Sequence, residues 1–349
     1  MATTVADEGR VRPIEQRLTD ERRLPPLGLW IVVTLLVIVV CTAWHNVTGA
    51  WRGIEVGGEL FWRTPWRLEI VFAVIFGYIL ACGGWVVRGV RRDLEALAPA
   101  LAIGPSELAE ERARIGAFPA STLFIATAAG FAVGIAIHAL VNAMLPSGHS
   151  ALEDLLWRAI RDVAIWVFSM RLILVVIGSS WRVSQIVERT ARIDLFDLRG
   201  LAPIVRIGLR NALAFAAGVS MLAAMSGDEV TLPVTLATMA IVGAVGAFAL
   251  LLPVRGARRA IRTAKNAELL AVRAAIRRTR TATLEGSPEG EREAMLLSGL
   301  LALEARLAGV VEWPFDLGTF VRLFFFLTLP LASWVAAAVV ERFVSYLLG

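Results

Sequence analysis

Residues 27–46 read LGLWIVVTLLVIVVCTAWHN and contain no Asp, Glu, Lys or Arg. An α-helix rises about 1.5 Å per residue, so a run of this length is about as long as the hydrocarbon core of a bilayer is thick. The preceding residues, 1–26, are too long and too charged for a secretory leader, and no small-residue cleavage site follows the run. The stretch therefore predicts a permanent membrane-spanning helix.

The rest of the chain repeats this pattern. Hydrophobic residues make up 57% of the 349 residues, charged residues only 19%, and the mean hydropathy is +0.68. In water such a chain would expose far too much apolar surface, whereas a bilayer accommodates it. We therefore expect an all-α polytopic bundle of about seven spans. The predicted spans are 27–46, 68–88, 119–144, 158–181, 208–226, 230–252 and 318–341.

The basic residues predict the orientation. Most of the 35 lie in the N-terminal tail and in the loops after the second, fourth and sixth spans, while the turn at 226–229 is acidic. By the positive-inside rule the N-terminus is cytoplasmic and the C-terminus outside. Positive charge in loops beside spans does not indicate a nucleic-acid partner. All basic residues except Lys265 are arginine, which suggests a bacterial source and a multi-pass protein of the inner (plasma) membrane.

The segment 253–317 is too patterned for a linker. Residues 255–284 are Arg-rich and helical in character, and Gly286-Ser287-Pro288 supplies a turn before a second helix over 288–311. That helix has an apolar stripe at helical spacing, made by Met295, Leu296, Leu300, Leu303, Leu307 and Val310. We expect a cytoplasmic helical hairpin whose stripe packs on its own first helix, on the membrane surface or on another subunit.

These features divide the chain into four parts. They are a cytoplasmic N-terminal tail (1–26), a six-span bundle (27–252), the cytoplasmic hairpin (253–317) and a seventh span with the C-terminus (318–349). The expected partners are the lipid bilayer, further copies of the chain in a homo-oligomer, and a cytoplasmic protein that engages residues 255–311.

Arg171 is the first candidate functional residue. It is ten residues from both Arg161 and Trp181, which places it near the middle of the fourth predicted span. A central arginine costs at least about 2.5–3.5 kcal/mol, so its side chain should face the bundle interior. Two interpretations follow: a buried arginine bonded to helix carbonyls or to an amide such as Asn211, or a contact for an anion or substrate.

His138 is the third candidate beside Arg171 and Asn211. His45 and His138 fall at similar depth on different spans, which would permit a haem or metal pair, but no flanking motif supports one. We therefore expect satisfied polar histidines and no cofactor. Cys41 and Cys82 lie at opposite depths and cannot form a disulfide. Gly130 and Gly134 form a GxxxG motif, which serves either packing within the chain or a dimer interface.

Catalytic motifs are missing from the sequence. It has no Gly-rich phosphate loop, no GxSxG elbow, no HExxH motif and no acidic pair within a span, so we do not expect an enzyme. Two function classes remain. The first is a channel or facilitator for an ion or small solute. The second is a membrane sensor or scaffold that does not transport and acts through the hairpin.

The predicted layout also resembles that of the insect gustatory and odorant receptors. Both have seven spans, a cytoplasmic N-terminus and a cytoplasmic helix before the last span, and those receptors are tetrameric cation channels. The resemblance is one of topology. The final predicted span begins Thr319-Phe320-Val321-Arg322 and lacks the family's Thr-Tyr and Gln-Phe signature, so no residue role follows from it.

Overall fold

The computed structural model describes residues 10–20, 24–48, 65–144, 152–225, 232–284, 290–313 and 321. Helices dominate this part of the chain, and the predicted all-α class is confirmed. The elements are β1 (Arg10–Val11), α1 (Ile14–Asp20), α2 (Pro26–Thr48), α3 (Pro65–Leu97), η3 (Ala98–Ala100), α4 (Pro105–Arg114), β2 (Phe118–Pro119), α5 (Ala120–Met144), α6 (Leu152–Thr190), η4 (Leu198–Leu201), α7 (Ala202–Met225), α8 (Leu232–Leu284) and α9 (Gly290–Ala308).

Six helices of the described part are long and apolar enough to cross a bilayer. These candidate spans are Pro26–Val47, Glu69–Ala100, Ala120–Ala143, Leu155–Thr190, Leu198–Leu222 and Leu236–Thr281. Each overlaps one of the first six predicted spans. The seventh, 318–341, lies outside the described residues except for Val321.

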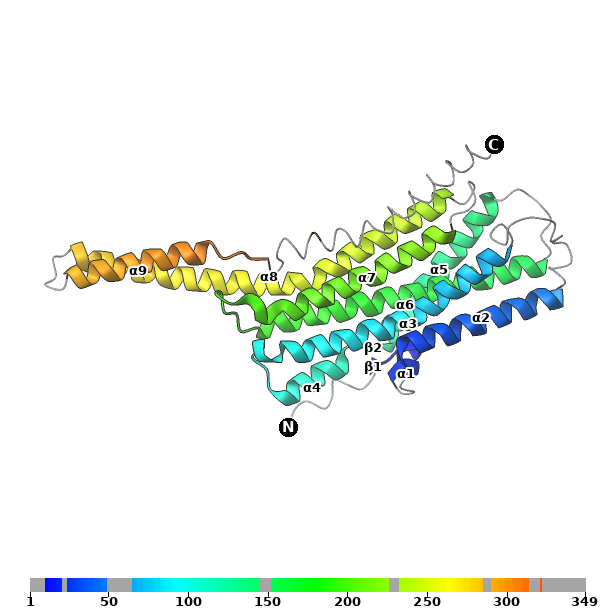
Figure 1. Ribbon diagram of the computed structural model, residues 1–349, viewed down its shortest axis with the longest axis horizontal. Helices are drawn as coiled ribbons and strands as arrows, with labels where there is room; N and C mark the ends of the chain where they lie inside the picture. The colour runs from blue at the N-terminus through cyan, green and yellow to red at the C-terminus, as the bar shows by residue number, and fades with distance from the viewer. Residues whose placement is uncertain are drawn as a thin grey trace, which may run out of the picture.

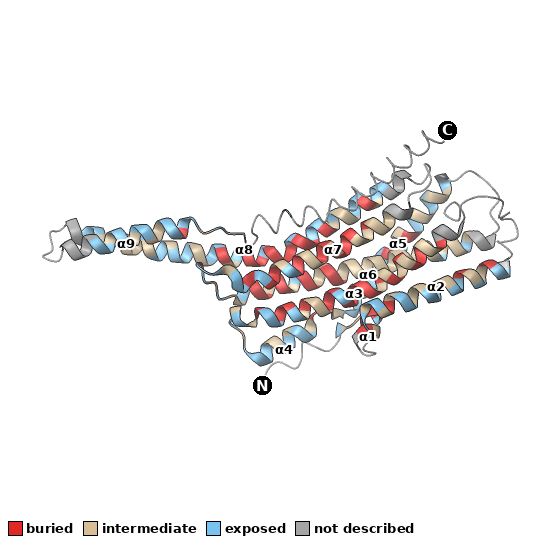
Figure 2. Cartoon of the chain, viewed as in Figure 1, coloured by how far each residue is buried: buried red, intermediate tan, exposed pale blue. Residues whose placement is uncertain are grey.

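The six long helices run along the long axis of the molecule and form one bundle (Figure 1). Neighbours in sequence pack as pairs, α2 with α3, α5 with α6 and α7 with α8, while α3 and α6 also contact helices outside their own pair. Buried residues gather where α3, α6, α7 and α8 meet (Figure 2). Val86, Val176, Ile204 and Ala257 are among the fully buried members of this core.

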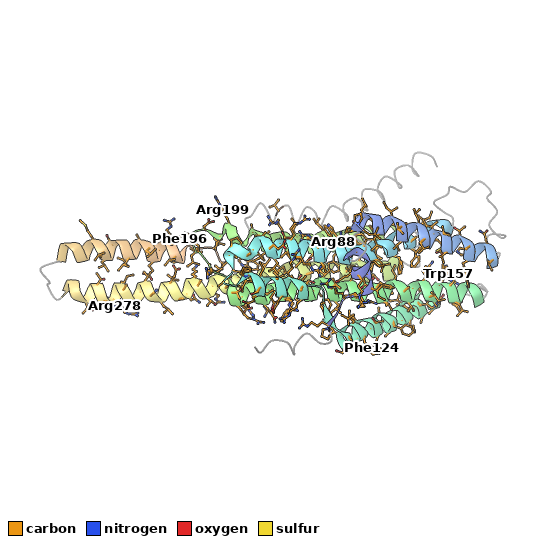
Figure 3. All side chains as sticks on the ribbon, turned by 90° about the horizontal axis from the view of Figure 1, so that it is seen from below. Arg88, Phe124, Trp157, Phe196, Arg199 and Arg278 are labelled. Atoms are coloured by element: carbon orange, nitrogen blue, oxygen red, sulfur yellow. The ribbon has the colours of Figure 1, made fainter. Side chains whose placement is uncertain are left out.

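The outer helices α2 and α5 expose large apolar side chains. On α2 they include Val32, Leu36 and Val39, and on α5 they include Phe124 and Ile125, each more than half exposed. Figure 3 shows Phe124 at the surface of α5. Soluble monomers rarely expose contiguous apolar patches of this kind. These faces are suited to lipid.

The hairpin projects from one end of the bundle (Figure 1), called here the hairpin end. Helices α8 and α9 pack against each other, and Leu307 of α9 is fully buried in the main core. Across the pair, Arg273 Nε lies 2.6 Å from Glu304 Oε1. Lys265 donates to the carbonyl oxygens of Ala308 and Val310, each at 2.8 Å. Three residues of the predicted stripe, Leu303, Leu307 and Val310, thus pack into the core that α8 shares, one of the three surfaces considered, whereas Met295 and Leu296 are exposed.

The membrane helix and the first arm of the hairpin are a single element. Residue 253, the expected boundary between the bundle and the hairpin, lies inside α8, which continues without a break for 53 residues. Pro253 lacks an N–H group, so a helix through it loses one backbone hydrogen bond. Membrane helices tolerate this loss when a neighbouring helix supplies a donor, as described below for Asn211.

The N-terminal tail packs on the bundle. Strand β1 pairs antiparallel with β2, with Val11 opposite Phe118, and α1 contacts α3. Arg88 of α3 donates from Nη2 to the carbonyl oxygens of Thr19 and, at 2.6 Å, Leu24. Figure 3 shows Arg88 beside this segment. These contacts hold residues 10–20 against the spans.

Candidate functional site

Charged side chains gather at the end of the bundle opposite the hairpin. They come from four candidate spans: His45 from α2, Glu69 from α3, His138 from α5, and Arg161 with Asp162 from α6. We call these five residues the four-helix network. None of their side chains is more than 24% exposed.

Arg161 stands at the centre of the four-helix network. Its Nη1 donates to Glu69 Oε1 at 3.2 Å, and its Nε donates to Asp162 Oδ1 at 3.4 Å. The same Glu69 oxygen lies 3.6 Å from His45 Nε2. The other oxygen of Asp162 lies 2.9 Å from His138 Nδ1. The result is a continuous chain from His45 to His138 across the bundle.

The surroundings of the network fix its geometry. The Asn142 amide nitrogen lies 2.8 Å from His138 Nε2; because an amide nitrogen only donates, Nε2 accepts and Nδ1 carries the proton toward Asp162. The Arg161 guanidinium lies 5.7 Å from the centre of the Phe72 ring, a distance at which cation–π attraction operates. The two histidines bind different carboxylates, with Arg161 between them, so the structure does not bring them together as a ligand pair.

Arg171 lies deeper in the bundle and pairs with the N-terminal tail. Its Nη2 is 3.0 Å from Glu15 Oε2 of α1, and both side chains are largely buried. Its guanidinium also lies 5.5 Å from the ring centre of Phe168. Burial raises the pKa of Glu15, and a backbone hydrogen bond together with the interaction with Arg171 opposes this rise without cancelling it. Arg171 therefore pairs with Glu15 and not with Asn211, and both interpretations of its role stay predictions.

Asn211 has a different structural role. Its Nδ2 donates to Ser180 Oγ at 2.7 Å and to the carbonyl oxygen of Ala249 at 3.3 Å. Ala249 is four residues before Pro253, so its carbonyl is the one that the missing proline N–H leaves without a helical donor. Asn211 of α7 thus satisfies the backbone of α8 where the membrane helix passes through Pro253.

A double-mutant comparison tests this assignment of Asn211. Asn211→Leu leaves a buried carbonyl unpaired and is expected to lower the free energy of unfolding by about 2 kcal/mol. In a Pro253→Ala background, residue 253 regains the N–H for Ala249, and the same change should cost clearly less. Denaturant unfolding of the four variants in detergent measures both losses. Equal losses in the two backgrounds would contradict the assignment.

The three residues singled out from the sequence lie in three separate places. Helix α6 gives the position of each along the bundle. His138 contacts Asp162 of α6, Arg171 is itself in α6, and Asn211 contacts Ser180 of α6, so they lie at three successive levels. Adjacent levels are nine residues apart, which corresponds to about 13 Å along a helix. The sequence does not reveal that Glu15 pairs with Arg171, or that Glu69 pairs with Arg161 beside Asp162. The only signal for the four-helix network is that ionisable residues fall near the same ends of four predicted spans.

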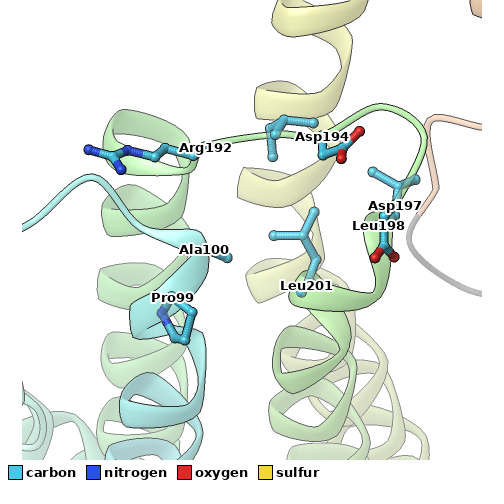
Figure 4. A pocket seen from close by; sticks show the side chains of 9 residues that line it. Pro99, Ala100, Arg192, Asp194, Asp197, Leu198 and Leu201 are labelled. Atoms are coloured by element: carbon cyan, nitrogen blue, oxygen red, sulfur yellow. The ribbon is translucent and has the colours of Figure 1, made fainter.

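The structure also has a small pocket at the hairpin end, between η3 and η4 (Figure 4). Its volume is about 190 Å³, and Arg192, Asp194 and Asp197 are among the residues that line it. Both carboxylates accept hydrogen bonds from nearby backbone N–H groups, those of Phe196 and Arg199. Binding pockets for organic ligands are usually larger, about 300–1,000 Å³. We interpret the carboxylates as supports for the turn before α7.

Comparison with protein-family models, with curated proteins and with solved structures finds no match for this chain. Its class therefore rests on its own fold. Six long apolar helices, lipid-suited faces on α2 and α5, and ionisable groups held inside the bundle define a helical multi-pass membrane protein.

Proposed function

We propose that this protein is a channel or facilitator in the plasma membrane, and that a proton or a small cation meets the four-helix network as it permeates. The observation that carries the proposal is the network itself. Ionisable side chains within membrane helices are expensive and commonly mark ion pathways or proton relays. Here five of them, from four helices, form one connected chain.

The charges of the network favour a positive ion. Its contacts set two carboxylates, Glu69 and Asp162, against the guanidinium of Arg161. With both histidines neutral, these five side chains together carry one net negative charge. Glu69 Oε2 is buried and accepts no hydrogen bond within the part of the chain that the structure describes. A buried acceptor without a donor is costly, so this oxygen would gain from a proton or a small cation beside it.

The proposed orientation follows the arginines. With the tail, the hairpin and the loop before α7 in the cytoplasm, the basic residues obey the positive-inside rule. The four-helix network then lies near the outer surface, and the Arg171–Glu15 pair lies toward the cytoplasm. An ion entering from outside would meet the network first. The proposal is for permeation and not for catalysis.

Flux through purified protein in liposomes tests this function. Wild-type protein should conduct protons, Na⁺ or K⁺ above empty liposomes. Glu69→Gln should lower the flux about tenfold, which corresponds to about 1.4 kcal/mol of lost interaction with the ion. Glu107→Gln makes the same chemical change at an exposed position on α4 and should conduct like the wild type. Thermal unfolding of each variant checks that the fold is kept.

Two outcomes would contradict the proposal. One is a wild-type protein that conducts none of the three ions. The other is a Glu69→Gln variant that is stable and conducts normally, because the network would then have no part in permeation.

A second function rests on a separate observation. The α8–α9 hairpin projects beyond the bundle (Figure 1), and residues 255–281 contain nine basic residues against one acid, Glu268. Such an arm suits a membrane scaffold or sensor that binds an acidic cytoplasmic protein. A protein without flux that retains a hairpin-dependent partner would favour this function over permeation.

A further inference from the structure

Two buried polar atoms at the four-helix network have no hydrogen-bond partner within the part of the chain that the structure describes. One is Oε2 of Glu69, a residue only 7% exposed, and the other is Nε1 of Trp157. An ionised carboxylate can only accept hydrogen bonds, and the indole nitrogen can only donate one. Buried polar atoms of this kind mark places where an internal water or an ion binds.

The donor and the acceptor share the same neighbours. Trp157 is one turn before Arg161 on α6, and Arg161 Nη1 donates to Glu69 Oε1. The Trp157 ring stacks on Trp44 of α2, with 5.3 Å between the ring centres. The next residue of α2, His45, lies 3.6 Å from the same Glu69 oxygen. Figure 3 shows Trp157 at the end of the bundle opposite the hairpin, where the network lies.

The oxygens of the network favour a proton over a metal cation. Glu69 and Asp162 have four carboxylate oxygens, and three of them already accept a hydrogen bond from Arg161 or His138. Among these four, Glu69 Oε2 is the one left. Na⁺ and K⁺ need several oxygens to replace their hydration shell, whereas a proton needs one. The guanidinium beside the same carboxylate also repels a metal cation.

Three titratable or charged groups described on the neighbouring helices face Glu69. From α2 they are His45 and the thiol of Cys41, which is a weak donor. From α6 it is Arg161, whose guanidinium also contacts Asp162. One guanidinium thus serves two carboxylates while the histidine and the thiol are neutral. A proton on Glu69 would remove the excess negative charge.

We infer that the permeant ion is the proton, and that Glu69 binds it at Oε2 through a water molecule held by Trp157 Nε1. This inference rests on the proposed permeation and names its substrate. The water accepts from the indole N–H and donates to Oε2, so it satisfies both buried atoms. When a hydronium ion gives its proton to Oε2, a water molecule remains and the carboxylate becomes a neutral carboxyl group. Oε1 stays an acceptor for Arg161.

Separate flux measurements test which ion passes. In liposomes, the wild type should carry protons, followed with a pH-sensitive dye inside, and should carry neither Na⁺ nor K⁺ above empty liposomes. Trp157→Phe keeps an aromatic ring against Trp44 but removes the N–H group, so it should lower the proton flux several-fold. Trp181→Phe is the matched control, because it makes the same change at a 47% exposed position of the same helix. It should carry protons like the wild type, and thermal unfolding checks the fold of each variant.

Infrared spectroscopy gives a readout that does not depend on flux. As the pH falls, the wild type should gain a protonated-carboxyl band that Glu69→Gln lacks. Trp157→Phe should shift the frequency of this band, because the carboxyl loses its bridging water, while Trp181→Phe should not.

The ways in which the inference can fail differ from the failure of permeation itself. Na⁺ or K⁺ flux equal to that of protons would overturn the inference and leave the proposed permeation standing. So would a stable Trp157→Phe variant with wild-type proton flux, or one with an unshifted carboxyl band. A protein that conducts none of the three ions would instead overturn the proposed permeation, and this inference with it.

Discussion

Replacing Arg171 with glutamine is expected to lower the free energy of unfolding by about 3 kcal/mol, the loss typical of a broken buried ion pair. The side chains of Arg171 and Glu15 are 15% and 6% exposed, so water screens the pair poorly. Without the guanidinium, Glu15 loses the two interactions with Arg171 that lower its pKa and keeps only a backbone hydrogen bond. The carboxyl must then take up a proton or remain charged in a buried site. Unfolding in detergent, followed by tryptophan fluorescence, measures the loss.

Glu15 provides the second arm of a double-mutant cycle with Arg171. Glu15→Gln should cost less than Arg171→Gln, because burial already disfavours the ionised carboxylate. The double variant should be more stable than the sum of the two losses predicts, since no unpaired carboxylate remains. Arg273→Gln removes a charge from an exposed pair and should cost at most about 0.5 kcal/mol. Strictly additive losses for Arg171 and Glu15 would show that the pair contributes nothing.

The cycle also separates structure from permeation at Arg171. If the pair serves only to dock α1, the double variant should regain the wild-type fold and conduct ions normally. A stable double variant with reduced flux would instead indicate that Arg171 takes part in ion permeation. The Arg171→Gln change alone cannot distinguish these cases, since loss of fold also reduces flux.

The sequence predicts the spans well because their signal is local. A run of about twenty apolar residues has few structures available in a bilayer other than a helix. Six such runs overlap the candidate spans of the structure. The stripe of Leu300, Leu303 and Leu307 similarly predicts the contact between α9 and α8, because helical spacing alone defines a face.

The connections between distant residues are beyond such local signals. Nothing near Arg171 indicates that its partner is Glu15, 156 residues earlier and outside every predicted span. The pairing depends on how the tail folds back on α3 and α6. Pro253 is similar: in the sequence it marks the end of a span, but Asn211 of another helix supplies the missing donor and α8 continues.

The GxxxG motif of α5 left two alternatives, and the structure decides for packing within the chain. A Cβ atom added at Gly130 would lie 2.5 Å from Val167 Cα and 2.7 Å from the Trp166 carbonyl oxygen. One added at Gly134 would lie 2.7 Å from Val163 Cα. These atoms belong to the backbone of α6 or are fixed to it and cannot rotate away. The two glycines therefore allow α5 and α6 to pack in direct contact.

Gly130→Val should consequently separate α5 from α6 and destabilise the protein by about 3 kcal/mol, the upper part of the range for overpacked sites. The same shift would move His138 of α5 away from Asp162 of α6, so ion flux should fall with stability. Gly243 of α8 is the matched control, because a Cβ atom there would have no described neighbour within 4 Å. Gly243→Val should leave both melting temperature and flux close to the wild type. If the two valine variants melted at the same temperature, the contact of Gly130 with α6 would have no energetic importance.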